Sequence, residues 1–207
     1  MPILSRTLAV SIGSLAIIAM APAPSLDLRP ARPAPEASVH DFDFMLGSWT
    51  FIAESKNPSW PPRFNGYWTG VRSGHGTIIE DDYRLVNDSG KVVTWRGHAY
   101  QPDETIFIGV TYRAFDPLTK RWTTAFVQPP AAGWALGTAW REGDAMWEAP
   151  SDSARSSRAH FYNIEANHFS WSLEVSKDGG KTWVADFLRV DARRVGGAAD
   201  SRTPPSY

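Results

Sequence analysis

The chain contains no cysteine among its 207 residues. It therefore has no disulfide, no thiolate for catalysis or metal binding, and no N-terminal cysteine that could carry a lipid. A domain of roughly 150 residues can bury enough surface to fold without such cross-links. We expect ordinary side-chain packing to stabilise this protein.

Charge of one sign is not concentrated anywhere in the chain. The sequence has 21 Lys and Arg against 22 Asp and Glu, which gives a net charge of −1 at pH 7 with neutral histidines. Nucleic-acid binding and electrostatic attachment to a membrane both need a cluster of basic residues. We therefore expect neither partner.

Long hydrophobic runs are also missing. The apolar stretch over residues 8–21 is shorter than the roughly 18 residues that a membrane-spanning helix needs. Arg6 precedes this stretch and small residues follow it to Ser25, which is the arrangement of a secretory signal peptide. We predict a signal peptide over 1–25, a periplasmic or secreted protein, and no membrane span once the signal is removed. An uncleaved anchor is the alternative.

Helical periodicity is absent between residues 39 and 194. Short alternating apolar stretches recur instead, separated by turns rich in Gly, Pro, Asn and Asp. The predicted strands span residues 49–54, 67–72, 77–86, 91–100, 106–115, 121–128, 134–140, 145–149, 158–164, 168–176 and 182–190. Short turns make neighbouring strands antiparallel, and a sheet of this size tends to close.

The sequence therefore predicts an all-β fold. We expect a single antiparallel barrel of about ten strands over 39–194, with a short N-terminal plug, a Pro-rich linker over 26–38 and a disordered tail over 195–207. The chain has 10 Trp, 10 Phe and 6 Tyr. Aromatic residues of this number favour a well-filled core, and the alternative is a cavity lined by flat rings.

A distinctive stretch precedes the first predicted strand: Asp41-Phe42-Asp43-Phe44-Met45-Leu46-Gly47-Ser48-Trp49. It is typical of a short apolar turn that plugs a barrel end, followed by a glycine turn and a tryptophan. The triplet Gly47-Ser48-Trp49 resembles the opening of lipocalin-like (calycin) barrels. In that group a basic residue from the barrel end covers the tryptophan by cation–π stacking, a role that Arg193 or Arg194 could fill here.

The wider pattern resembles a group of bacterial proteins of unknown function, the DUF1579 type, which have a lipocalin-like barrel. The residues that carry this resemblance are the plug stretch, Arg96-Gly97, Tyr112-Arg113-x-Phe115-Asp116-Pro117, Lys120-Arg121-Trp122 and the hairpin over 176–183. The resemblance covers 39–194 and implies a barrel. It implies no catalytic residues.

One segment matches the Asp-box pattern of sialidases: Ser176-Lys177-Asp178-Gly179-Gly180-Lys181-Thr182-Trp183. In a sialidase this motif is repeated on propeller blades and accompanies an arginine cluster. A single copy in a small barrel favours a structural turn, in which Asp178 bonds backbone amides.

None of the five histidines has a partner at zinc-binding spacing, so we predict no metal site. His98 shares a predicted strand face with Thr94, Arg96 and Tyr100, and His160 shares one with Arg158 and Tyr162. Inward faces would create a polar, aromatic cavity. Outward faces would be an ordinary wet sheet surface, which we favour because antiparallel sheets often have one. The acidic run Glu80-Asp81-Asp82 is likewise predicted to be solvated.

Binding of a small apolar or aromatic molecule in the barrel mouth is the function that we favour. The candidate ligand-binding residues are Arg96, His98, Tyr112, Trp122, Trp140, His160 and Trp171. The first alternative is a hydratase, isomerase or lyase with His98 or His160 as general acid or base. The second is a structural or interaction protein with a filled barrel. We predict no cofactor, although one inward histidine could bind haem iron, as in barrels that resemble nitrobindin.

Overall fold

The structure is a computed structural model that describes residues 36–58, 60–95, 98–128, 133–152 and 156–196. The predicted signal peptide over 1–25, most of the predicted linker, most of the predicted tail and Arg96 lie outside these residues. Within them, no helix is long and apolar enough to cross a membrane.

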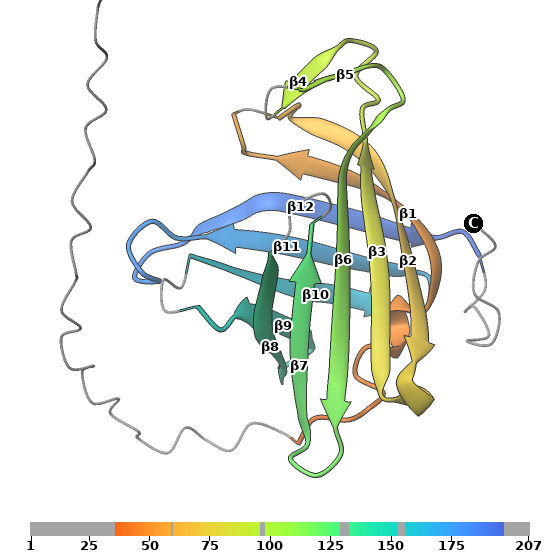
Figure 1. Cartoon of the computed structure of the whole chain (residues 1–207), viewed down its shortest axis with the longest axis vertical. Coiled ribbons are helices and arrows are strands. Elements are labelled where there is room, and N and C mark those ends of the chain that lie inside the picture. The colour runs from red at the N-terminus through yellow and green to blue at the C-terminus, as the bar shows by residue number, and fades with distance from the viewer. Residues whose placement is uncertain (1–35, 59, 96–97, 129–132, 153–155, 197–207) are drawn as a thin grey trace, which may run out of the picture. The chain divides into compact units, whose positions relative to one another are not determined.

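Ten strands form a closed antiparallel barrel, which confirms the predicted fold class (Figure 1). Around the barrel their order is β1-β12-β11-β10-β9-β8-β7-β6-β3-β2. Their bounds are β1 (Gly47–Ser55), β2 (Arg63–Ser73), β3 (Ile78–Val86), β6 (Thr105–Asp116), β7 (Arg121–Val127), β8 (Trp134–Glu142), β9 (Ala145–Pro150), β10 (Ser157–Glu165), β11 (His168–Val175) and β12 (Val184–Arg194). A short 3₁₀ turn, η2 (Gly74–Gly76), joins β2 to β3.

The predicted strand over 91–100 is wrong. This segment forms a separate two-stranded sheet of β4 (Val93–Trp95) and β5 (His98–Tyr100), which stands at one end of the barrel in Figure 1. Asn87 is buried at the base of this two-stranded sheet. Its side-chain amide holds the two ends of the segment together, because it donates to the carbonyl oxygens of Lys91 at 2.8 Å and Gln101 at 3.0 Å. These contacts satisfy backbone groups that a continuous barrel strand would have paired.

The opposite end of the barrel is closed by the plug, which includes the 3₁₀ turn η1 (Asp43–Met45). Gly47 has a φ of 102°, a conformation that favours glycine, and it turns the chain from the plug into β1. The indole Nε1 of Trp49 then donates to the carbonyl oxygen of Met45 at 3.0 Å. The predicted roles of this glycine and this tryptophan are therefore confirmed.

Arg194, rather than Arg193, covers this tryptophan. Its guanidinium carbon lies 4.0 Å from the centre of the Trp49 ring. The same guanidinium donates to the carbonyl oxygens of Phe44 at 3.2 Å and Ala166 at 2.8 Å. The last barrel strand is thereby tied to the plug.

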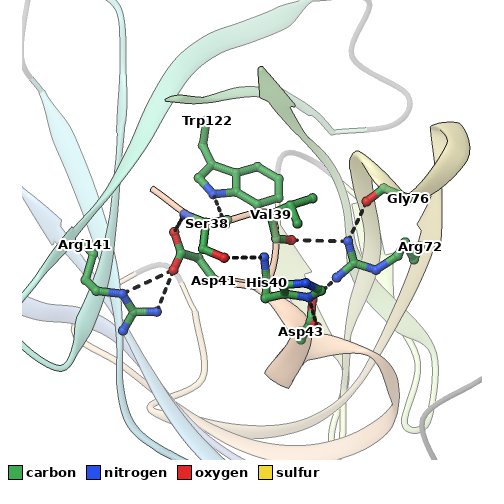
Figure 2. A network of polar contacts seen from close by, with 9 residues as sticks. All are labelled: Ser38, Val39, His40, Asp41, Asp43, Arg72, Gly76, Trp122 and Arg141. Carbon is green, nitrogen blue, oxygen red and sulfur yellow. Dashed lines mark hydrogen bonds and ion pairs between the residues drawn. The ribbon is translucent and has the colours of Figure 1, made fainter. Parts of the chain in front are cut away.

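A polar network holds the segment before η1 against the barrel (Figure 2). Arg141 Nη2 donates to Asp41 Oδ1 at 2.9 Å, and the backbone NH of Ser38 donates to Asp41 Oδ2 at 2.8 Å. The indole of Trp122 donates to the carbonyl oxygen of Ser38 at 3.2 Å. Arg72 forms an ion pair with Asp43 on the other side.

Aromatic side chains pack densely at the plug end. Phe42 meets Trp122 edge to face at 5.1 Å between ring centres, and Trp49 meets Phe169 at 4.8 Å. All four side chains are almost fully buried. The filled core that the aromatic content favours is therefore present at this end of the barrel.

The predicted alternation in β11 is confirmed, with Phe169 and Trp171 pointing into the barrel core. The opposite face is polar but covered, since Ser172 is fully buried and donates to Asp186 Oδ1 at 2.8 Å. Glu174 on that face pairs with Arg158 at 2.6 Å.

Candidate functional site

A cavity of about 300 Å³ lies inside the barrel, away from the plug. Trp60 of the β1–β2 connection and Phe107 near the start of β6 line it, which places it at the end where the β4–β5 hairpin stands (Figure 1). The cavity is partly open and mostly apolar. Its aromatic lining residues are Trp60, Trp68, Tyr83, Phe107, Phe126 and Trp171.

Tyr83 is the centre of a stacked aromatic wall. Its ring is stacked with Phe107 at 5.4 Å and with Phe126 at 6.4 Å, and it lies 5.1 Å from Trp68. Gly109 on the neighbouring strand makes this position possible, because a Cβ there would lie 2.5 Å from the tyrosine ring. These rings form one continuous aromatic wall of the cavity.

A buried cluster of charges borders the cavity, with Arg113 and Glu148 among the lining residues. Arg113 on β6 is only 1% exposed, and it forms ion pairs with Asp81 on β3 and Glu148 on β9. The Nη2 of Arg113 lies 3.2 Å from Glu148 Oε2. The indole of Trp68 donates to Asp81 Oδ1 at 2.7 Å. The cavity thus combines flat apolar walls with fixed charges.

These charges do not cancel when both carboxyl groups are ionised. Two carboxylates face one guanidinium, which leaves a formal charge of −1 inside the barrel. Burial raises the pKa of Tyr83, and the charge of Glu148 raises it further. The tyrosine therefore stays neutral at physiological pH and keeps its proton as a hydrogen-bond donor.

Of the predicted site residues that the structure describes, one lies at the cavity. Trp171 lines it, and Trp122 also points inward but belongs to the packed plug end. Tyr112 is on the outer face of β6, where it lies 6.0 Å from the exposed Trp134. His98 lies on β5 of the separate hairpin and is exposed.

The remaining described candidates, Trp140 and His160, form a stacked row on the outer face of the barrel. Trp147 lies between them, 6.4 Å from Trp140 and 4.2 Å from His160. Arg158 covers Trp147 at 4.8 Å. The face that carries His160 therefore points outward, as favoured from the sequence, and it does not form the polar cavity of the inward alternative.

The surroundings of His160 favour its neutral form. Burial lowers its pKa, while the carboxylates of Glu174 and Asp186 oppose this shift and Arg158 adds to it. Its buried Nδ1 has no hydrogen-bond partner among the described residues. The row of rings explains the burial, since Trp147 stacks on the imidazole.

None of the five histidines lines the cavity. Haem ligation by an inward histidine therefore has no candidate residue in the cavity wall. The described part of the chain also contains no group of three His, Cys, Asp or Glu side chains arranged to hold a metal ion.

Sequence reasoning missed the three residues of the charged cluster beside the cavity, Asp81, Arg113 and Glu148. The run Glu80-Asp81-Asp82 was expected to be solvated, but Asp81 is 1% exposed. A usable signal exists in β3, where Asp81 shares a strand face with Ile79, Tyr83 and Leu85, while the neighbouring charges Glu80, Asp82 and Arg84 are on the other face. Arg113 in β6 and Glu148 in β9 likewise share a strand face with apolar or small residues.

The Asp-box segment forms the turn between β11 and β12. Asp178 Oδ1 accepts hydrogen bonds from the backbone NH groups of Lys181 at 3.1 Å and Thr182 at 2.9 Å, and Oδ2 accepts one from the Thr182 hydroxyl at 2.7 Å. These bonds, the Thr182 hydroxyl first, lower the pKa of Asp178 to about 2. Trp183 packs against Arg158 at 4.3 Å. The segment has the structural role that was predicted.

No protein-family model matches the chain, and no curated protein matches it. Among solved structures, the crystal structure of Rv2717c from M. tuberculosis aligns with a TM-score of 0.48 and 13% identity, covering 78% of this chain and 99% of that chain. A protein of unknown function from the DUF3598 family, Npun_R4044 from Nostoc punctiforme PCC 73102, aligns with a TM-score of 0.26 and 10% identity, covering 78% of this chain and 100% of that chain. Both TM-scores are below 0.5, so neither similarity informs the function. The DUF1579 resemblance stays a prediction.

Proposed function

We propose that this protein is an exported carrier or receptor that binds a small apolar or aromatic molecule inside its barrel. One observation carries the proposal: six aromatic side chains line a partly open cavity of about 300 Å³. Small-molecule sites are typically concave and mostly apolar, with a few placed polar groups. Barrels of about this size can enclose one small ligand.

The dimensions of the cavity limit the ligand. Its volume is at the lower end of the range of roughly 300–1,000 Å³ that is usual for ligand pockets. The stacked wall of Tyr83, Phe107 and Phe126 offers aromatic contacts to a ligand. A ligand with one or two rings fits both features.

The two alternatives are less well supported by the geometry. His98 and His160, the acid–base candidates of the enzyme hypothesis, both lie away from the cavity. The filled-barrel hypothesis describes the plug end, where Phe42 and Trp122 are fully packed. The filled-barrel hypothesis does not account for the cavity at the end of the barrel away from the plug.

Three probes with one phenyl ring and similar chains test the proposal: propylbenzene, 2-phenylethylammonium and 3-phenylpropionate. Calorimetric titration of the purified protein should show one site for at least one of them. An Ala159→Phe variant should weaken that binding at least tenfold, because Ala159 points into the cavity from β10.

The matched control is Ala125→Phe, which adds the same ring beside Tyr112 on the outer face of β7. It should leave the affinity within twofold. Thermal unfolding of both variants identifies any loss of fold. The proposal is overturned if no probe binds the wild-type protein, or if Ala159→Phe folds and binds as the wild type does.

A further inference from the structure

The charged cluster of the cavity contains one carboxylate more than its internal pairing requires. Asp81 already pairs with Arg113 and accepts the hydrogen bond from Trp68. Glu148 adds a second carboxylate to the same guanidinium. Its side chain is 15% exposed, whereas that of Asp81 is fully buried, so Glu148 is the carboxylate that a ligand can reach.

The other charged residue of the cavity lining does not offset this excess. Arg158 is paired with Glu174 at 2.6 Å. Its guanidinium lies over the rings of Trp147, at 4.8 Å, and Trp183, at 4.3 Å, on the outer face of the barrel. The interior therefore retains the negative charge of the Asp81, Arg113 and Glu148 cluster.

The aromatic walls favour the same sign of ligand. The faces of Trp, Tyr and Phe rings attract cations, and cages of such rings recognise ammonium groups. Trp68 and Tyr83 are in contact with each other at 5.1 Å and both line the cavity with Glu148. A cation in this cavity lies close to aromatic rings and to a carboxylate, in surroundings that screen charge poorly.

We propose that the ligand is an organic cation, an amine or quaternary ammonium group attached to an aromatic or apolar body, with its charged group beside Glu148. This inference rests on the proposed function and specifies its ligand class. An anionic ligand would instead be placed next to the carboxylate of Glu148 and a guanidinium that already pairs with two carboxylates. A neutral hydrocarbon would leave the carboxylate of Glu148 without a ligand partner.

The three phenyl probes separate ligand charge from ligand shape. At pH 7 we expect 2-phenylethylammonium to bind at least tenfold more tightly than propylbenzene, and 3-phenylpropionate to bind most weakly. Glu148→Gln keeps the shape and a hydrogen-bond acceptor for Arg113 but removes the charge. It should weaken binding of the cation at least tenfold and change binding of propylbenzene by no more than twofold.

Glu174→Gln is the matched control, because Glu174 also pairs with an arginine and is similarly buried but lies on the outer face. It should not change the order of the probes. The inference is overturned, and the proposed function stands, if propylbenzene or 3-phenylpropionate binds as tightly as the cation or if a folded Glu148→Gln keeps full affinity for the cation. Should Glu148→Gln not fold, the order of the three probes on the wild-type protein decides alone. Absence of binding by all three overturns the proposed function itself.

Discussion

The guanidinium of Arg113 and the carboxylate of Glu148 meet inside the barrel, with Nη2 3.2 Å from Oε2. Their strands, β6 and β9, are not neighbours, because β7 and β8 lie between them in the sheet. The ion pair therefore crosses the interior and divides it. Packed aromatic rings fill the side with the plug, and the cavity occupies the other side.

Removal of a carboxylate from this cluster should destabilise the fold. Asp81→Ala leaves Arg113 with one partner fewer and Trp68 without its acceptor, and breaking a buried ion pair costs about 3–5 kcal/mol. Asp82→Ala is the control, since Asp82 pairs with exposed Arg84 on the other face and should cost about 0–1 kcal/mol. Urea denaturation measures both, and equal losses would contradict the structural role of the cluster.

The link between the last strand and the plug gives a second prediction. Arg194→Ala removes a cation–π contact and several hydrogen bonds to backbone carbonyls, so it should lower the free energy of unfolding by about 2–3 kcal/mol. Arg193→Ala changes an exposed neighbour and should cost no more than about 0.5 kcal/mol. If both variants unfold at the same urea concentration, Arg194 does not anchor the plug.

The turn between β11 and β12 should contribute stability that depends on pH. The pKa of Asp178 is lowered from 3.8 to about 2 in the folded protein, so its ionised form is favoured by folding. This contribution is fully present above pH 3.8 and is lost as the pH falls towards 2. The difference in unfolding free energy between wild type and Asp178→Ala should shrink over that range. A difference that stays constant as the pH falls to 2 would contradict this role of Asp178.

His160 should make the protein more sensitive to mild acid. Its folded pKa is lowered from 6.5, mainly by burial, so the unfolded chain takes up this proton at a higher pH than the folded chain does. Stability is therefore lost as the pH falls below about 6.5. His160→Gln should remove this loss in urea denaturation between pH 7 and 5, and His98→Gln on the exposed hairpin should keep it.

His160→Ala should leave the affinity for the phenyl probes within twofold of the wild type. A larger loss of affinity would indicate that the outer face of the barrel takes part in ligand binding.

Export is tested by mass. A signal peptide over 1–25 predicts that the denatured protein from the periplasmic fraction begins at Leu26. A mass that includes residues 1–25 in that fraction would support the uncleaved anchor instead. The full-length chain confined to the cytoplasm would contradict export.

The fold could be predicted from the sequence because its signals are local. Turn residues and alternation mark the strands, and Gly47 and Trp49 mark the entry from the plug. The strand over 91–100 was wrong because its apolar and aromatic residues also suit a short hairpin, which Asn87 closes through contacts with distant carbonyls.

The site was harder to predict because a shift of one residue moves a side chain to the other face of the sheet. In β6, Tyr112 was the candidate, but its neighbour Arg113 points inward. The outer face of that strand carries Ile108, Val110 and Tyr112, so hydrophobicity alone favours the wrong side. The better signal was a single charge on an otherwise apolar strand face, Asp81 in β3 and Glu148 in β9.

Chemical-shift mapping by NMR, with the tightest of the three phenyl probes, decides where the ligand binds. We expect the largest shifts at backbone amides around the cavity, such as those of Thr111, Thr124 and Ala159. Shifts that cluster instead around Trp140 and His160 would place binding on the outer face and would contradict a ligand site inside the barrel.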